Sequence, residues 1–244
     1  MNSLYILTAA GFLILTLVFA FLLISLLQKG IDQTSWSGER KQKVKSRMIF
    51  FLILWFVFIS VLSIAGISGN FNLFPFNVMP VFAIPLITIL ILTFSPSTGD
   101  VLQSIPMKDF IQLQVFRLFV EILLWMTFIQ NLLPVQMTFE GRNWDVLTGI
   151  SAPIIAHLFI SNRRVLIAWN IICLGLLINV VSIAILSMPT PLRVFDNEPA
   201  NTIVTVFPFI FLPGFLVPLA YGLHFLSLRK LLSREITTQN AMVS

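Results

Sequence analysis

Two charged residues lie within a long apolar run, QVFRLFVEILLW, from Gln114 to Trp125. If this run is helical, Gln114, Arg117 and Glu121 fall within about 60° of one another and form one polar stripe. Arg117 and Glu121 are four residues apart, so their side chains can pair along the helix. A charge at the centre of a bilayer costs about 2.5–3.5 kcal/mol, so we expect the stripe to face protein or water rather than lipid.

Further polar side chains lie near the cytoplasmic ends of other apolar runs, including both histidines of the chain. Each one alone is explained by hydrogen bonding between packed helices, worth about 0.6 kcal/mol on average. Together they predict a binding site in the inner half of the membrane, because intramembrane ionisable residues are usually functional. The predicted ligand-binding residues are Arg117, Glu121, His157, Asn170, Tyr221 and His224.

The elements that must position these residues are membrane-spanning helices. The 244-residue chain is 57% hydrophobic and only 10% charged, whereas a soluble protein carries about 25% charged residues. Apolar runs of about 20 residues, long enough to cross a bilayer as helices, recur along it. We therefore predict an all-α membrane protein, a seven-transmembrane-helix bundle forming a single polytopic domain over residues 1–244. The predicted spans are 4–27, 48–67, 78–94, 110–133, 146–160, 165–186 and 203–228.

The basic residues predict the orientation of this bundle. Of the 15 lysines and arginines, all but Arg117, Arg142 and Arg193 fall in the first, third and fifth connections or in the C-terminal tail. Basic residues accumulate on the cytoplasmic side of membrane proteins. The asymmetry predicts an N-terminus outside and a cytoplasmic C-terminus, and we expect the protein in the bacterial inner membrane.

Two predicted spans contain residues that interrupt helices. The last has prolines at 208, 213 and 218, which should kink or partly unwind it because proline removes a backbone hydrogen bond. The fifth is short and contains Gly149 and Pro153, and Asp145 just before it is interpreted as an ordinary N-cap. Short or broken spans often mark a binding site, because they free backbone groups for a ligand.

Three functions remain open on this evidence. The first is a non-enzymatic bundle that binds or moves a small ligand or ion through its buried polar cluster. The second is a haem b protein in which His157 and His224 are the axial ligands. The third is an enzyme acting on lipid or isoprenoid substrates, with Glu121 and the histidines as acids and bases. No catalytic motif or metal-ligand spacing is recognisable, so we assign no catalytic residue. The expected partners are the lipid bilayer and a small ligand or ion, with no nucleic acid.

Overall fold

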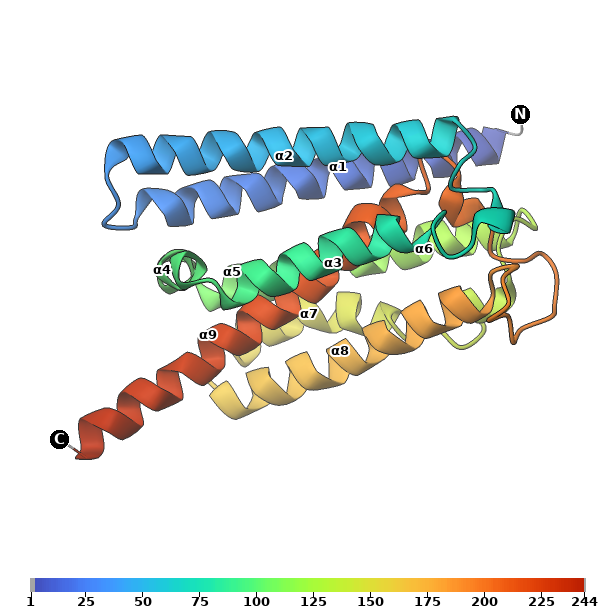
Figure 1. The fold of residues 1–244 in the computed structure, drawn as a ribbon. Helices are drawn as coiled ribbons and strands as arrows, with labels where there is room; N and C mark the ends of the chain where they lie inside the picture. Colours follow the sequence, from blue (N-terminus) through green and yellow to red (C-terminus); the bar gives the residue numbers. More distant parts are fainter. Residues whose placement is uncertain (1–2, 244) are drawn as a thin grey trace.

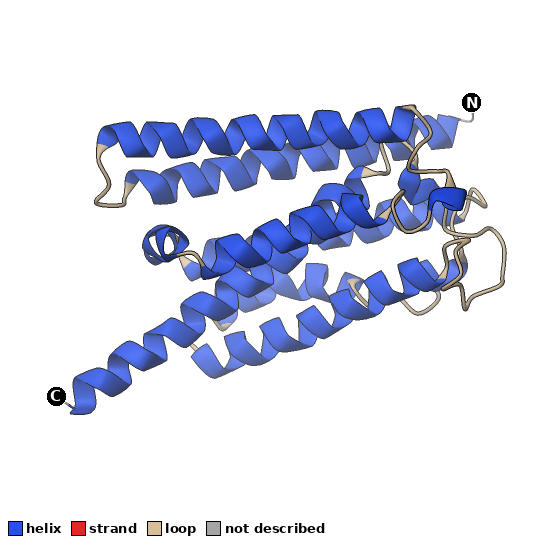
Figure 2. Cartoon of the chain, viewed as in Figure 1, coloured by secondary structure: helices blue, strands red, loops and turns tan. Residues whose placement is uncertain are grey.

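The computed structural model describes the backbone of residues 3–243 and the side chains of residues 3–233. Within that part of the chain every regular element is a helix, and no strand occurs (Figure 2). Most of the helices run roughly side by side along one long axis, and the chain begins and ends at opposite ends of the bundle (Figure 1). The predicted all-α class is confirmed.

The first two helices form an antiparallel hairpin along one side of the bundle (Figure 1). They are α1 (Ser3–Asp32) and α2 (Gly38–Ile64). α2 begins ten residues earlier than the predicted span, because Ser37 caps it by accepting a hydrogen bond from the Arg40 backbone N–H. The basic cluster predicted to lie in a loop therefore lies on the first turns of this helix.

The middle of the chain is broken into short helices. α3 (Met79–Phe94) is followed by α4 (Pro96–Ser104) after a bend of 78°. α5 (Met107–Leu113) and α6 (Phe116–Phe128) replace the single span predicted over 110–133. Between α5 and α6 the backbone N–H groups bond to carbonyls three residues back, and this tighter turn places Arg117 at the start of α6.

The last part of the chain is also interrupted. α7 (Val146–Leu158) and α8 (Arg163–Leu186) are followed by a short 3-10 turn, η3 (Ile203–Thr205), and then by a π-helical segment, η4 (Leu212–Leu216), which leads into α9 (Val217–Val243). The predicted break in the last span is thus confirmed.

Five helical segments, with α5 and α6 counted as one and η4 and α9 as another, are long and apolar enough to cross a membrane, and the bent pair α3–α4 makes up to six within the described residues. By the length and hydropathy of these helices the protein is an integral membrane protein. α7 has 13 residues, or about 20 Å, which is shorter than the roughly 30 Å hydrocarbon core. Seven spans and their orientation therefore stay predictions.

Burial separates a central pair of helices from a peripheral one. In the 18-residue apolar windows of the segments Leu212–Ser233 and Met107–Phe128, 67% and 56% of the residues are buried, against 6% for α2. The core of the bundle is consequently formed around α6 and the α9 segment, and α2 turns its large apolar side chains outward, where a bilayer would solvate them.

Candidate functional site

The arginine of the apolar run is paired with an aspartate from another segment. Arg117 is 2% exposed and Asp145 is 5% exposed. Nε of Arg117 donates to Oδ2 of Asp145 at 2.6 Å, and Nη2 contacts the second carboxylate oxygen. Two parallel contacts of this kind form the strongest arrangement for an arginine and a carboxylate. Asp145 occupies the N-cap position of α7, as interpreted, but its side chain makes no capping bond to the helix and pairs with Arg117 instead.

A histidine and an asparagine extend this pair across the bundle. Nη1 of Arg117 lies 2.9 Å from Nε2 of His224, and Nδ1 of His224 lies 2.9 Å from Oδ1 of Asn170. A guanidinium can only donate, so Nε2 must be the accepting, unprotonated nitrogen. Nδ1 then bears the proton and donates to Asn170, whose amide nitrogen donates in turn to the Leu166 carbonyl at 2.8 Å. His224 is thus held as a neutral imidazole.

Glu121 lies one turn along α6 and has a different partner. It is 1% exposed. Nδ2 of Asn143 lies 2.8 and 2.7 Å from its two carboxylate oxygens. The Asp145 backbone N–H donates to Oδ1 of Asn143, which fixes the amide with its nitrogen toward Glu121. The predicted direct pairing of Arg117 with Glu121 is wrong, because Asp145 occupies the guanidinium edge.

Asn143 and Asp145 reach this position through a segment without α-helix, which contains one short 3-10 turn, η2 (Val135–Met137). Asp145 contacts Arg117, yet the preceding helix, α6, ends at Phe128. The segment 129–145 therefore returns along α6 by about eleven residues, roughly 16 Å. Irregular backbone within a membrane is tolerated only where protein surrounds it. Much of the segment is buried, including Met137, whose carbonyl accepts a hydrogen bond from Asn143.

We use the term polar centre for the residues that these contacts join, together with the adjacent Glu121 and Asn143. The polar centre consists of Arg117, Glu121, Asn143, Asp145, Asn170 and His224. Sequence reasoning missed Asn143 as a member, and it assigned Asp145 another role. The sequence did contain a signal for Asp145. A buried arginine requires an acidic partner, and Asp145, next to a short apolar helix, was a candidate for that partner.

Two of the predicted site residues lie outside these contacts. His157 is exposed, and its ring nitrogen bonds to the Pro153 carbonyl of its own helix at 2.8 Å. The buried Tyr221 packs its ring against Phe82 and Phe225. The structure therefore brings together Arg117, Asn170 and His224, with Glu121 beside them.

These positions do not fit the haem alternative. Both ring nitrogens of His224 are already engaged, one by Arg117 and one by Asn170. An axial ligand must offer a free ring nitrogen to iron. His157 is exposed on α7 and bonds within its own helix. The pairing of these two histidines around one haem has no geometric support.

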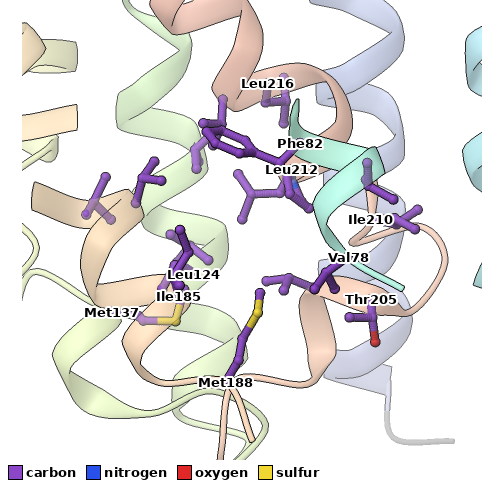
Figure 3. Close-up of a pocket in the computed structure, with 18 of the residues that line it drawn as sticks. Val78, Phe82, Leu124, Met137, Ile185, Met188, Thr205, Ile210, Leu212 and Leu216 are labelled. Atoms are coloured by element: carbon purple, nitrogen blue, oxygen red, sulfur yellow. The ribbon is translucent and has the colours of Figure 1, made fainter. Parts of the chain in front are cut away.

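A cavity of about 220 Å³ adjoins the polar centre. Most of its lining is apolar and comes from α3, α6, α8 and residues 204–220, and Arg117, Glu121 and Asp145 also belong to its wall. Figure 3 shows side chains such as Phe82, Leu124 and Met188 arranged around the hollow. Lining residues run along α6 from Phe116 to Leu124, about 12 Å. An apolar cavity of about 150 Å³ binds benzene-sized molecules, so this cavity has room for a small ligand.

Comparison with known proteins identifies the region that contains this site. Neither the curated proteins nor the solved structures give a match to the chain. Residues 75–232, nearly two thirds of the 244, match a family described as "Domain of unknown function (DUF8737)". The match begins after the α1–α2 hairpin and includes every residue of the polar centre. The chain belongs to this family.

Proposed function

We propose that the protein binds a small ligand within the membrane, with the apolar part of the ligand in the cavity and its polar end at the polar centre. The observation that supports this most is that Arg117, Glu121 and Asp145 form part of the wall of an otherwise apolar cavity. Binding sites for small molecules combine a mostly apolar lining with a few placed polar groups. A role in packing alone would not require a hollow beside buried charges.

The enzyme alternative has weaker support. The acids of the polar centre are held by internal partners, Asp145 by Arg117 and Glu121 by Asn143. His224 is bonded at both ring nitrogens, so it lacks the free nitrogen that a general base needs. We therefore favour binding or movement of a ligand over chemical conversion.

The orientation of the bundle is part of this proposal. We infer that the chain crosses the membrane seven times, with the segment 129–145 and α7 together forming one crossing. A return of about 16 Å in the segment and about 20 Å in α7 together make about 36 Å, enough to cross the roughly 30 Å hydrocarbon core. The cavity then extends from the polar centre toward the outer face, because its lining includes Arg117 at one end and residues 188, 190 and 192 from the connection after α8 at the other.

Cysteine labelling tests the orientation. In a Cys173→Ala background, single cysteines at positions 38 and 238 should react with a membrane-impermeant reagent only from the cytoplasmic side. Cysteines at positions 72 and 197 should react only from outside. Finding 38 and 238 on opposite sides would refute seven crossings. The same labelling in cells would show whether the bacterial inner membrane is the right compartment.

Mass spectrometry of the purified protein tests ligand binding. The wild type, extracted gently from its host membrane, should carry a small molecule that is released on unfolding. Ala184→Phe fills the cavity and should lose that molecule, whereas Ile178→Phe adds the same ring on the exposed face of α8 and should keep it. Equal retention by the two variants would contradict binding in the cavity.

A further inference from the structure

The charges of the polar centre do not balance around Glu121. Arg117 and Asp145 form a two-contact ion pair, so their charges cancel. His224 is neutral, because its Nε2 accepts from Arg117. Asn143, an uncharged amide, is the partner of the Glu121 carboxylate among the residues whose side chains are described. Among the described side chains Glu121 therefore has no cation paired with it alone, since Arg117 is already paired with Asp145.

Most of the guanidinium is already engaged before a ligand with a negative end could reach it. Its Nε and Nη2 face Asp145, its Nη1 faces His224, and Nη2 also lies 3.4 Å from the Cys173 carbonyl. An anion would have to displace Asp145 or share the guanidinium with it, and two like charges at this depth repel each other strongly. Four of the five guanidinium N–H groups thus already face an acceptor, and Asp145 balances the charge of the guanidinium.

Glu121 retains accepting capacity toward a ligand. A carboxylate offers about four lone-pair positions, and the two amide hydrogens of Asn143, which also face the Met137 carbonyl, engage at most two of them. Glu121 is part of the cavity wall. An ionised carboxylate in an apolar site is costly unless an opposite charge joins it.

We infer that the ligand has a cationic end, such as a protonated amine, and a short apolar body, and that Glu121 is the residue that selects it. This inference rests on the proposed binding function and specifies the chemical class of the ligand. The ammonium bonds to the free lone pairs of Glu121 and balances its charge, while the apolar body fills the space beside Phe82, Leu124 and Leu212. A carboxylate ligand is rejected, and an alcohol of the same length binds more weakly because it has no charge to offer.

Three probes of equal chain length test this inference: octylammonium, 1-octanol and octanoate. Each is added to protein in lipid nanodiscs at neutral pH, and the rise in melting temperature is converted to an affinity, because a ligand that binds the folded state raises its stability. We expect octylammonium to bind best. In Glu121→Gln its affinity should fall at least about tenfold, as for loss of a hydrogen bond to a charged group. Glu140→Gln, the same change at an exposed glutamate, should leave the affinity unchanged.

Two further variants separate the possible failures. Glu121→Asp keeps the charge and should retain the preference for octylammonium, which also covers the case in which Glu121→Gln does not fold. Ala184→Phe should abolish binding of every probe. If octanol or octanoate binds as well as octylammonium but Ala184→Phe still abolishes binding, the cationic ligand is refuted and the proposed function stands. If no probe gives a shift that depends on the cavity, both are refuted.

Discussion

The α1–α2 hairpin and the family region 75–232 bury backbone in a membrane in different ways. The hairpin consists of two uninterrupted helices of 30 and 27 residues, in which each N–H beyond the first turn finds its carbonyl within the helix. In the family region α3 bends, α5 stops before α6, the segment 129–145 is irregular and η4 widens to a π-helix. Every such interruption frees polar backbone groups that lipid cannot satisfy.

Buried and half-buried side chains supply the missing partners at these interruptions. Nη1 of Arg229 donates to the Ser95 carbonyl at 2.8 Å, at the bend between α3 and α4. Nζ of Lys230 donates to the Leu102 carbonyl at 2.6 Å, near the end of α4. The irregular segment supplies Asn143 and Asp145 to the polar centre. The interruptions are therefore where polar groups are held in place and where the cavity forms, and the hairpin supports this region from outside.

The ion pair should give the largest effect on stability. Asp145→Asn leaves the buried guanidinium without a counter-charge, and removing one partner of a buried pair typically costs about 3–5 kcal/mol. Unfolding in mixed micelles measures this loss. Asp196→Asn, the same change at an exposed residue, should cost almost nothing.

A double variant sharpens the same prediction. Adding Arg117→Gln to Asp145→Asn removes the stranded charge and should recover part of the loss, because residues in direct contact are not additive. If the double variant is as unstable as the sum of the two single ones, Arg117 and Asp145 do not stabilise each other.

Close packing of α7 on α6 should give the next largest effect. A Cβ on Gly149 would clash with the Leu118 backbone nitrogen and lie 2.8 Å from the Leu118 Cα. Because these are backbone atoms, α6 and α7 would have to move apart to make room for it. Gly149→Ala should cost about 1–3 kcal/mol, as overpacking usually does. Gly175→Ala on α8 has open space around the added methyl and should be neutral or slightly stabilising, since alanine favours helix. Equal melting of the two variants would mean that α7 is not held against α6.

The joint between the hairpin and the family region should give a smaller effect. Pro218 has no N–H to offer the Gly214 carbonyl four residues earlier, and Nε1 of Trp55 on α2 donates to that carbonyl at 2.8 Å. Trp55→Phe keeps an aromatic ring but removes the donor, so we expect a loss of about 1 kcal/mol. Trp144→Phe, at an exposed tryptophan, is the matched change and should be silent. If Trp55→Phe leaves the free energy of unfolding unchanged, the hydrogen bond from the hairpin does not stabilise η4.

The hairpin was largely predictable from sequence and the polar centre was not, for a physical reason. Hydropathy over 20 residues locates a straight helix, and Pro213 and Pro218 indicated that the last span is interrupted. The inward position of Arg117 followed from the cost of exposing it to lipid. Its partner depends on a fold that brings residues 28 positions apart together. Helical spacing indicated Glu121, four residues away, as the partner of Arg117. Local geometry could not show that the fold places the Asp145 carboxylate against the guanidinium instead.

The exposed ion pair in the connection between α8 and η3 should give the smallest effect and a measurable pH dependence. The bond from Nη2 of Arg193 at 2.9 Å, helped by the bond from the Ala200 backbone N–H, holds the pKa of Glu198 below its ordinary value. A carboxyl whose pKa is lower in the folded state stabilises that state above its unfolded pKa, about 4.3. This stabilisation is lost as the pH falls through the folded value.

Carboxyl ¹³C NMR of glutamate-labelled protein, with the signal assigned through Glu198→Gln, measures this midpoint directly. Arg193→Gln should raise the Glu198 midpoint toward the ordinary value, and Arg40→Gln, at the opposite end of the bundle, should not move it. Since the carboxylate of Glu198 is 71% exposed, salt should shrink the difference. Salt should have little effect on the ion pair of the polar centre, because that pair is buried and little screened. If neither Arg193→Gln nor added salt changes the Glu198 midpoint, Arg193 does not set the pKa of Glu198. The surface pair could then no longer serve as the screened counterpart of the buried pair.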